Sequence, residues 1–382
     1  MKALRKFIDK QKPHFEKGGK FQKLESAFDA VETLFYVPDK VTTSGSHIRD
    51  AIDMKRTMII VFIALIPALL FGMWNIGYQH FMSIGETSDF ITMFLYGFLK
   101  MLPIIIVSYG VGLGLEILFA QIRGHEVNEG FFVSGLLIPM ILPIETPLWQ
   151  VAVAVAFAVI FGKEVFGGTG MNIVNPALIA RAFLFFAYPS NMSGEKVWIS
   201  DMGDVISGAT PLGNALVGHF DAIPSTYDLF MGTIPGSIGE TSVLMILVGA
   251  VILLVTGIAN WRVMFSVFAG GYIMGLLFNL WGANDYMHLE AYKHLLLGGF
   301  AFGAVFMATD PVTATQTKNG MYIYGFLIGV IAILIRVFNP AYPEGMMLSI
   351  LLMNVFAPLI DYYVIESNIK RRLKRMKLAI KN

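Results

Sequence analysis

The sequence predicts an all-α membrane protein that crosses the bilayer many times. Of its 382 residues, 55% are hydrophobic and 14% are charged, whereas the average charged fraction of soluble domains is about 25%. Several apolar runs approach the roughly 20 residues that a helix needs to span a hydrocarbon layer about 30 Å thick. These observations exclude a soluble globular domain.

We expect ten spanning helices, arranged as two five-helix repeats that are inverted relative to each other in the membrane. The first five are residues 57–77, 98–120, 130–142, 148–162 and 172–187. The second five are residues 241–259, 261–281, 293–308, 321–338 and 346–364. The chain is thereby divided into an N-terminal segment (1–53), a first repeat (54–187), a loop (188–240), a second repeat (241–364) and a basic tail (365–382).

Two features that recur in both halves predict the repeat. Asn175-Pro176-Ala177 opens the fifth span, and Asn339-Pro340-Ala341 stands just before the tenth. The third and eighth spans are both short and glycine-rich, and each runs into a proline, Pro143 or Pro311. Because five is odd, the second copy is inverted. Short or broken helices at matching positions predict a central pathway lined by helix ends and freed carbonyls.

The distribution of basic residues predicts that both termini are cytoplasmic. Ten spans place the two ends on one side, and both ends are basic, as are turns on that side at Arg123, Lys163, Arg262 and Lys318. The loop 188–240 then lies outside, and it carries one lysine and six acidic residues. The charged N-terminus indicates no cleaved signal peptide, and residues 24–34 have the apolar spacing of a short amphipathic helix.

The residue types present exclude several kinds of cofactor. The chain has no cysteine, so by itself it can form no disulfide, thiolate zinc site or thiolate-held iron–sulfur cluster. All seven histidines fall in the tail, in loops or at span edges, whereas a membrane haem needs axial histidines inside the spans. The net charge of +1 gives no sign of a nucleic-acid partner, and none is expected.

The outer loop contains the stretch Asp204-Val205-Ile206-Ser207-Gly208-Ala209-Thr210-Pro211. Gly208 and Ala209 leave space beside the Thr210 hydroxyl, and Pro211 stiffens the chain just after it. A bulky group could therefore approach this hydroxyl. The alternative is a solvated turn in which serine and threonine cap backbone groups.

Few ionisable side chains fall within the expected spans. Glu116 lies deep in the second span, where a carboxylate faces a cavity or a partner; it is either a cation ligand or one half of an ion pair, with Arg181 or Arg336 as its partner. Asp361 lies near the end of the last span, and helix capping or an interface contact is the alternative to a cation role. Asp310 ends the short eighth span and is placed to aim its carboxylate into the pathway.

Amide and aromatic side chains in the fifth span are suited to a ring-shaped ligand. Asn172 and Asn175 offer donors and acceptors at the start of a broken helix. Helix capping is their alternative, which we favour for Asn172 and not for Asn175. Phe183, Phe185 and Phe186 form an aromatic cluster suited to an isoalloxazine or quinone ring, with packing against lipid as the alternative.

Several stretches distributed over nearly the whole chain carry a family resemblance. They are Asp204-x-x-Ser207-Gly208-Ala209-Thr210 and residues 125–132 (HEVNEGFF), 163–170 (KEVFGGTG), 175–178 (NPAL), 181–189 (RAFLFFAYP), 234–240 (IPGSIGE), 307–312 (MATDPV) and 339–347 (NPAYPEGMM). Their combination resembles the B-subunit of the bacterial sodium-translocating NADH:quinone oxidoreductase. The related D-subunit of the Rnf ferredoxin:NAD complex shares the flavin motif but lacks a long cytoplasmic head such as residues 1–50.

The resemblance implies two flavins on this chain. A periplasmic flavin transferase would attach FMN through a phosphoester to Thr210, within the motif formed with Asp204, Ser207, Gly208 and Ala209. Riboflavin would bind non-covalently in the membrane core, and Asn172, Asn175 and Asp310 are its candidate ligands.

The resemblance also implies a place in a six-subunit complex of the bacterial inner membrane. Another subunit oxidises NADH, so no NADH site is expected here; electrons pass through the flavins to quinone while sodium is pumped outward. Gly112, Phe183 and Phe185 are the quinone candidates, and Glu116 and Asp361 are the candidates for the sodium pathway. Apart from transported sodium, no metal is expected.

A rival interpretation is a channel or transporter for a small solute, because such proteins also use inverted five-helix repeats. The Ser-Gly-Ala-Thr motif favours the redox subunit over a channel, since a channel has no need of a flavin attachment site. The sequence leaves open which quinone is used and whether sodium or a proton is the coupling ion.

Overall fold

The computed structural model describes residues 2–15, 19, 21, 28, 32, 36, 42–48, 54–124, 130–194, 197–203, 208–339, 342 and 344–381. Within these ranges every regular element is helical and no strand occurs. Six helices are long and apolar enough to cross a membrane, which confirms a multi-pass helical membrane protein. They are α3 (Met54–Ile84), α4 (Phe90–Arg123), α6 (Leu148–Gly162) with the turn η3 (Glu164–Phe166), α12 (Trp261–Trp281), α15 (Lys318–Phe338) and α16 (Met346–Lys381).

The remaining expected spans are short or divided. α5 (Phe131–Ile141), α7 (Pro176–Ala187) and α11 (Val243–Val255) are apolar helices of fewer than 18 residues. In place of one helix over 293–308, the structure has α13 (Ala291–Leu296), α14 (Phe300–Phe302) and the π-helical turn η6 (Gly303–Met307). Ten spans and an inverted repeat therefore remain a prediction.

The division between α13 and α14 depends on two consecutive glycines. Gly298 and Gly299 have φ angles of 58° and 68°, in the left-handed region that side chains with a Cβ rarely occupy. A Cβ on Gly299 would also lie 2.7 Å from the carboxylate of Glu240. The break in the helix and the position of Glu240 are therefore linked.

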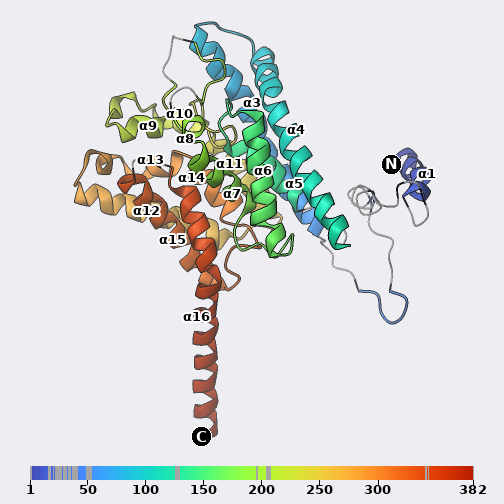
Figure 1. The fold of residues 1–382 in the computed structure, drawn as a ribbon. Coiled ribbons are helices and arrows are strands. Elements are labelled where there is room, and N and C mark those ends of the chain that lie inside the picture. The colour runs from blue at the N-terminus through green and yellow to red at the C-terminus, as the bar shows by residue number, and fades with distance from the viewer. Residues whose placement is uncertain are drawn as a thin grey trace.

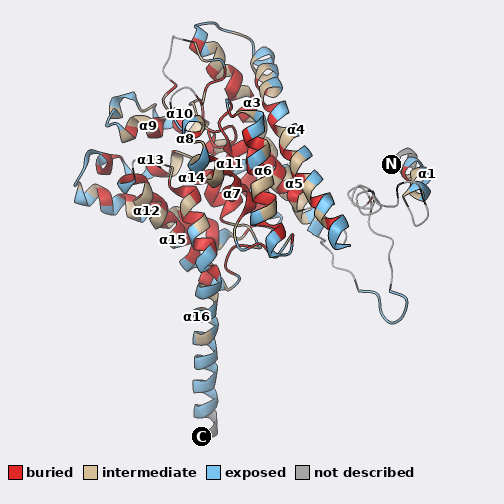
Figure 2. Ribbon diagram, in the orientation of Figure 1, coloured by how far each residue is buried: buried red, intermediate tan, exposed pale blue. Residues whose placement is uncertain are grey.

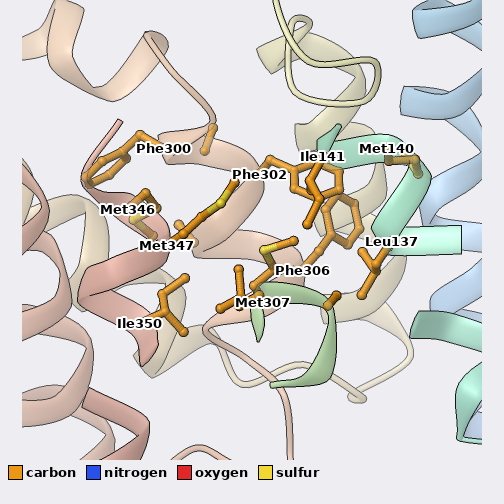
Figure 3. Packing of buried hydrophobic residues seen from close by; sticks show 14 of the residues in the cluster. Leu137, Met140, Ile141, Phe300, Phe302, Phe306, Met307, Met346, Met347 and Ile350 are labelled. Carbon is orange, nitrogen blue, oxygen red and sulfur yellow. The ribbon is translucent and has the colours of Figure 1, made fainter. Parts of the chain in front are cut away.

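The centre of the bundle is where the short helices meet. Buried residues are concentrated there (Figure 2), and Figure 3 shows how they interlock. The labelled residues come from α5 (Leu137, Met140, Ile141), from α14 and η6 (Phe300, Phe302, Phe306, Met307) and from α16 (Met346, Met347, Ile350). Because lipid is as apolar as these side chains, close van der Waals packing rather than water exclusion holds the helices together.

The two ends of the bundle differ. The segment between α7 and α11 forms α8 (Pro189–Met192), α9 (Pro211–Leu216), η4 (Phe220–Ala222) and α10 (Thr226–Met231). These elements gather at one end, whereas α16 continues beyond the other helices at the opposite end (Figure 1). The basic part of α16, from Lys370 to Lys377, is exposed. The loop and the basic tail therefore lie at opposite ends of the bundle.

Three further elements complete the described chain: α1 (Lys2–Gln11), η1 (Lys12–His14) and η5 (Asp285–His288). The predicted amphipathic helix over 24–34 lies outside the described residues, apart from Phe28 and Glu32. Glu32 is buried, and it forms ion pairs with Arg5 at 3.1 Å and Lys12 at 3.1 Å.

Candidate functional site

Thr210 stands immediately before α9 and caps it. Its Oγ1 accepts a hydrogen bond from the Gly213 N–H at 3.1 Å, and Pro211, which has no N–H to leave unpaired, occupies the first helical position. A hydroxyl that accepts a hydrogen bond keeps its own proton available. Thr210 is half-buried, so capping and accessibility coexist. Asp204 and Ser207 of the same motif lie outside the described residues.

Thr210 lies on the wall of a cavity of about 370 Å³. The cavity is bounded by separate segments: the loop around Ala209, the end of α7 through Phe185, the turn at Gly298 and Gly299, and Tyr342. Pockets for small ligands generally measure about 300–1,000 Å³. The predicted attachment residue therefore borders a cavity large enough for a ring system.

The loop is fastened to the helices just before the motif. The carboxylate of Asp201 accepts hydrogen bonds from Lys100 Nζ at 2.6 Å and from the Tyr96 hydroxyl at 2.9 Å. These two bonds hold the pKa of Asp201 below its usual value. The Tyr96 ring in turn stacks on His80 at 4.1 Å. The segment that precedes the motif is thus anchored to α3 and α4.

A buried cluster of charged side chains lies beside the Thr210 cavity. Arg181 of α7 donates to Glu240 at 3.1 Å and also to Glu344. Arg336 of α15 donates to the carbonyls of His294 at 2.6 Å and Leu297 at 3.0 Å. Burial is the main reason that the pKa of Glu344 rises to about 7. The prediction that Arg181 or Arg336 pairs with Glu116 is therefore wrong.

Glu116 pairs instead with Lys163. Both side chains are buried, with 4% and 5% of their surface exposed, and Lys163 Nζ donates to Glu116 Oε1. Glu116 Oε2 has no hydrogen-bond partner among the described residues. Lys163 follows the end of α6, as expected for a turn residue, but its side chain points inward rather than into solvent.

A second cavity, of about 100 Å³, is lined by Lys163 together with Asn172, Asn175 and Asp310. Asn175 Nδ2 donates to Asp310 Oδ2 at 3.5 Å across 135 residues of chain. Thr313 also donates to Asp310, at 3.0 Å. The structure thus brings the three polar residues predicted for a ring-shaped ligand into one cavity.

The capping roles of the two asparagines are the reverse of those predicted. Asn175 Oδ1 accepts from the backbone N–H groups of Ala177 at 2.9 Å and Leu178 at 3.4 Å, so Asn175 caps α7. Asn172 does not begin a helix, and its side chain donates to the Val174 carbonyl at 3.2 Å. The helix starts later than residue 172 because Pro176 is well suited to the first helical position.

Asp361 makes capping contacts. Its two carboxylate oxygens accept from the Gln316 N–H at 2.7 Å and from the N–H and hydroxyl of Thr317 at 3.0 and 2.6 Å. Thr317 caps α15. Asp361 therefore ties α16 to the start of α15, which agrees with the capping alternative.

The three residues predicted for quinone have different surroundings. Gly112 packs so closely on α5 that a Cβ would lie 1.9 Å from the Phe131 ring. Phe183 stacks on an aromatic ring of α6 at 4.6 Å. Phe185 borders the Thr210 cavity, where its ring meets Tyr342 at 4.3 Å.

The Glu116–Lys163 pair and the second cavity together form an inner region of the bundle. Sequence reasoning missed two of its polar residues. Asn354 of α16 accepts from the Asn175 N–H at 3.3 Å and donates to the Tyr324 hydroxyl at 2.8 Å. A lone amide in an apolar span is itself a signal of a buried contact. Lys163 was treated as a marker of topology, and nothing in its immediate sequence distinguishes an inward from an outward lysine.

These features define a helical membrane protein with polar side chains buried between its spans. Residues 41–370 match the sequence model of the NQR2, RnfD, RnfE family. The chain therefore belongs to that family. It is 49% identical over 399 residues to the B-subunit of Na(+)-translocating NADH-quinone reductase from Chromohalobacter salexigens, covering 98% of this chain and 97% of the relative.

Further relatives have the same name. The protein of Ectopseudomonas mendocina is 49% identical and that of Pseudomonas aeruginosa 47% identical, each over 402 residues that cover 98% of this chain and 99% of the relative. The resemblance to the B-subunit that the motifs predicted is thereby confirmed.

Proposed function

We propose that the chain is the membrane subunit of a redox-driven sodium pump that passes electrons from NADH, oxidised on another subunit, to quinone. The name of its relatives supports the overall reaction. The observation that carries the proposal for this chain is that Thr210 lines a cavity of about 370 Å³.

Thr210 is the proposed attachment point for FMN. A phosphoester requires an accessible hydroxyl, and the cavity beyond it has the volume and the aromatic walls that suit a flavin ring. Phe185 and Tyr342 would contact the ring, while Gly208 and Ala209 leave room for the phosphate. A flavin supplies the electron transfer that the side chains of this chain cannot perform.

Riboflavin is proposed to bind with one edge of its ring system in the second cavity, the one lined by Asn172, Asn175 and Asp310. Its volume of about 100 Å³ is below the usual range for a whole small-molecule ligand, about 300–1,000 Å³, so only part of the ring system fits there. Asn172, Asn175 and Asp310 provide donors and acceptors for the polar edge of the ring. Their role is to orient that edge and to exclude competing water.

The ion pathway is proposed to begin at Glu116 on the cytoplasmic side and to use Asp361. A carboxylate oxygen is the kind of ligand that a small hard cation prefers, and Glu116 Oε2 has no partner among the described residues. The positions of the outer loop and the basic tail at opposite ends of the bundle support cytoplasmic termini (Figure 1).

An inverted repeat is proposed for the ten spans. In the first half α4 packs against α5 and α6, and α6 packs against α7; in the second half α12 packs against α13 and α15, and α15 packs against α16. Taken in chain order, these are the same three neighbour relations. The third and eighth spans, which are both short or broken, occupy equivalent places in this scheme.

The test of the central proposal is Thr210→Ala. We expect a folded chain without covalent flavin, seen as loss of flavin fluorescence from the denatured chain in a gel. Ser225→Ala is the matched control, because Ser225 caps α10 in the same loop as Thr210 caps α9. Each variant should lose about 1 kcal/mol of stability from the lost cap, and only Thr210→Ala should lose flavin. A Thr210→Ala chain that still fluoresces after denaturation would refute the assignment.

A further inference from the structure

Lys163 connects the two parts of the inner region. It immediately follows α6, and its Nζ donates to Glu116 Oε1 on α4. The same side chain lines the cavity that contains Asn172 and Asp310. One ammonium group therefore neutralises the buried carboxylate and also borders the polar cavity.

The hydrogen bonds that hold the turn at Lys163 involve its backbone and not its side chain. The Lys163 carbonyl accepts from the N–H groups of Phe166 at 3.2 Å and Gly168 at 3.1 Å, which hold the turn after α6. The ammonium can donate three hydrogen bonds, and among the described residues its bond partner is Glu116. Because the lysine stem is flexible, the ammonium can move without any change in the turn.

The carboxylate next to Lys163 in the chain does not compete for this ammonium. Glu164, the next residue, is bound by Arg123, whose guanidinium donates to the Glu164 carboxylate at 3.2 Å and to its carbonyl at 2.6 Å. Lys163 is thus left to compensate Glu116 alone. This differs from Arg181, which binds two carboxylates at once.

One oxygen atom of the pair, and one on the wall of the adjoining cavity, have no hydrogen-bond partner in the part of the chain that the structure describes. Glu116 Oε2 and Thr169 Oγ1 are buried and have no hydrogen-bond partner among the described residues. Thr169 lines the same cavity as Lys163. Hard cations take oxygen ligands of these kinds. These two oxygens are therefore suited to a cation, while the ammonium occupies the other oxygen of Glu116, Oε1.

We propose that Lys163 is a tethered competitor of sodium: its ammonium holds Glu116 until sodium takes its place, and it then moves toward Asp310 in the cavity. This inference rests on the proposed role of Glu116 in sodium uptake. It also links electron transfer to sodium uptake. Negative charge that arrives in the cavity would attract the ammonium, and the Glu116 carboxylate would then be free to bind sodium.

The experiment compares the purified complex containing wild-type chain with Lys163→Gln. Thermal unfolding is followed as sodium chloride replaces choline chloride at constant ionic strength. Without the ammonium, Glu116 is uncompensated, so the variant should be less stable in choline and should recover in sodium. Because no competitor must be displaced, the sodium concentration that gives half of the shift should fall about tenfold or more.

Two variants serve as controls. Lys100→Gln removes another lysine that pairs with a carboxylate, this one at the exposed pair with Asp201, and should leave the sodium response unchanged. Glu116→Gln/Lys163→Gln replaces the ion pair with a neutral pair of similar shape. It should fold in both salts and show no sodium-dependent shift, even if Lys163→Gln alone folds poorly in choline.

Each result decides the inference. A sodium response of Lys163→Gln equal to that of wild type, failure of this variant to assemble in sodium as well as choline, or a wild-type shift in the double variant would each overturn it. Measuring the turnover of Glu116→Gln against sodium concentration distinguishes failure of the competitor role of Lys163 from failure of the proposed role of Glu116. If its sodium dependence is altered while Lys163→Gln responds like wild type, only the competitor role fails. If both respond like wild type, the proposed role of Glu116 fails too.

Discussion

The buried charges near the Thr210 cavity and the buried charges near Glu116 are built differently. In the outer cluster each arginine has several partners: Arg181 binds Glu240 and Glu344, and Arg336 binds backbone carbonyls of the α13–α14 segment. In the inner pair one lysine meets one carboxylate oxygen, and the other oxygen has no partner among the described residues.

This difference indicates a structural role for the arginine cluster and cation exchange for the lysine–glutamate pair. A guanidinium that holds two carboxylates and lies between three segments of chain cannot leave without breaking the packing around it. An ammonium on a flexible side chain with a single partner can move away, and only that one ion pair is then broken. The outer cluster is therefore expected to fix the shape of the Thr210 cavity, and the inner pair to respond to a cation.

Loss of the outer brace should give the largest effect. Arg181→Met leaves Glu240 and Glu344 without their shared cation in a buried site, which should lower the free energy of unfolding by about 3–5 kcal/mol. The thermal unfolding of the purified complex measures this, and added sodium should not restore it. Arg181→Lys keeps the charge and should lose less. Recovery of Arg181→Met by sodium would show that both clusters exchange cations.

An intermediate effect is expected where α4 touches α5 near the inner pair. Gly112 lies one helical turn before Glu116, and its Cβ would overlap the Phe131 ring. Gly112→Ala should therefore lower stability by about 1–3 kcal/mol through overpacking. Gly114→Ala is the matched control, because nothing lies within 4 Å of its Cβ position. Equal melting temperatures for the two variants would mean that this contact does not constrain the inner region.

The smallest expected effect at neutral pH is the contribution of the Glu344 proton to the stability of the outer cluster, and this contribution depends on pH. Burial raises the pKa of Glu344 from 4.5 to about 7, so the folded chain binds its proton more tightly than the unfolded chain between these values. The contribution of Glu344 to stability is then fully present below pH 4.5 and is lost as the pH rises through about 7. Melting temperatures of wild type and Glu344→Gln across this range measure it. Parallel curves would contradict the raised pKa.

The sequence predicted those elements whose signals are local. The bounds of α6 and α12 agree with the expected spans at both ends. For α12 the reasons are visible in the sequence, since Asn260 caps its start and Gly282 ends it with a φ of 57°. Thr210 was likewise found from a contiguous motif. Its neighbours across the cavity, such as Tyr342, come from other parts of the chain.

Long-range pairings could not be predicted in the same way. Glu116 and Lys163 are 47 residues apart, and Asn175 and Asp310 are 135 apart, so their contacts depend on how the helices pack. Glu116 was assigned the wrong class of partner because arginines are more obvious than a lysine at the edge of a span. The reversed capping of Asn172 and Asn175 was avoidable, since Pro176 directly after Asn175 is a local signal for a helix start.

The measurement that tests the inner region most directly is quinone reduction against sodium concentration in wild type and Glu116→Gln. The variant keeps the size of the side chain and removes the charge. The Lys163 ammonium, which loses its partner, can turn toward Asp310 in the adjoining cavity, so we expect assembly of the complex, normal flavin content and a higher sodium requirement that high sodium partly meets. Glu366→Gln, at an exposed pair with Lys370, is the control and should match wild type. Superimposable curves for wild type and Glu116→Gln would contradict the assignment of sodium uptake to Glu116.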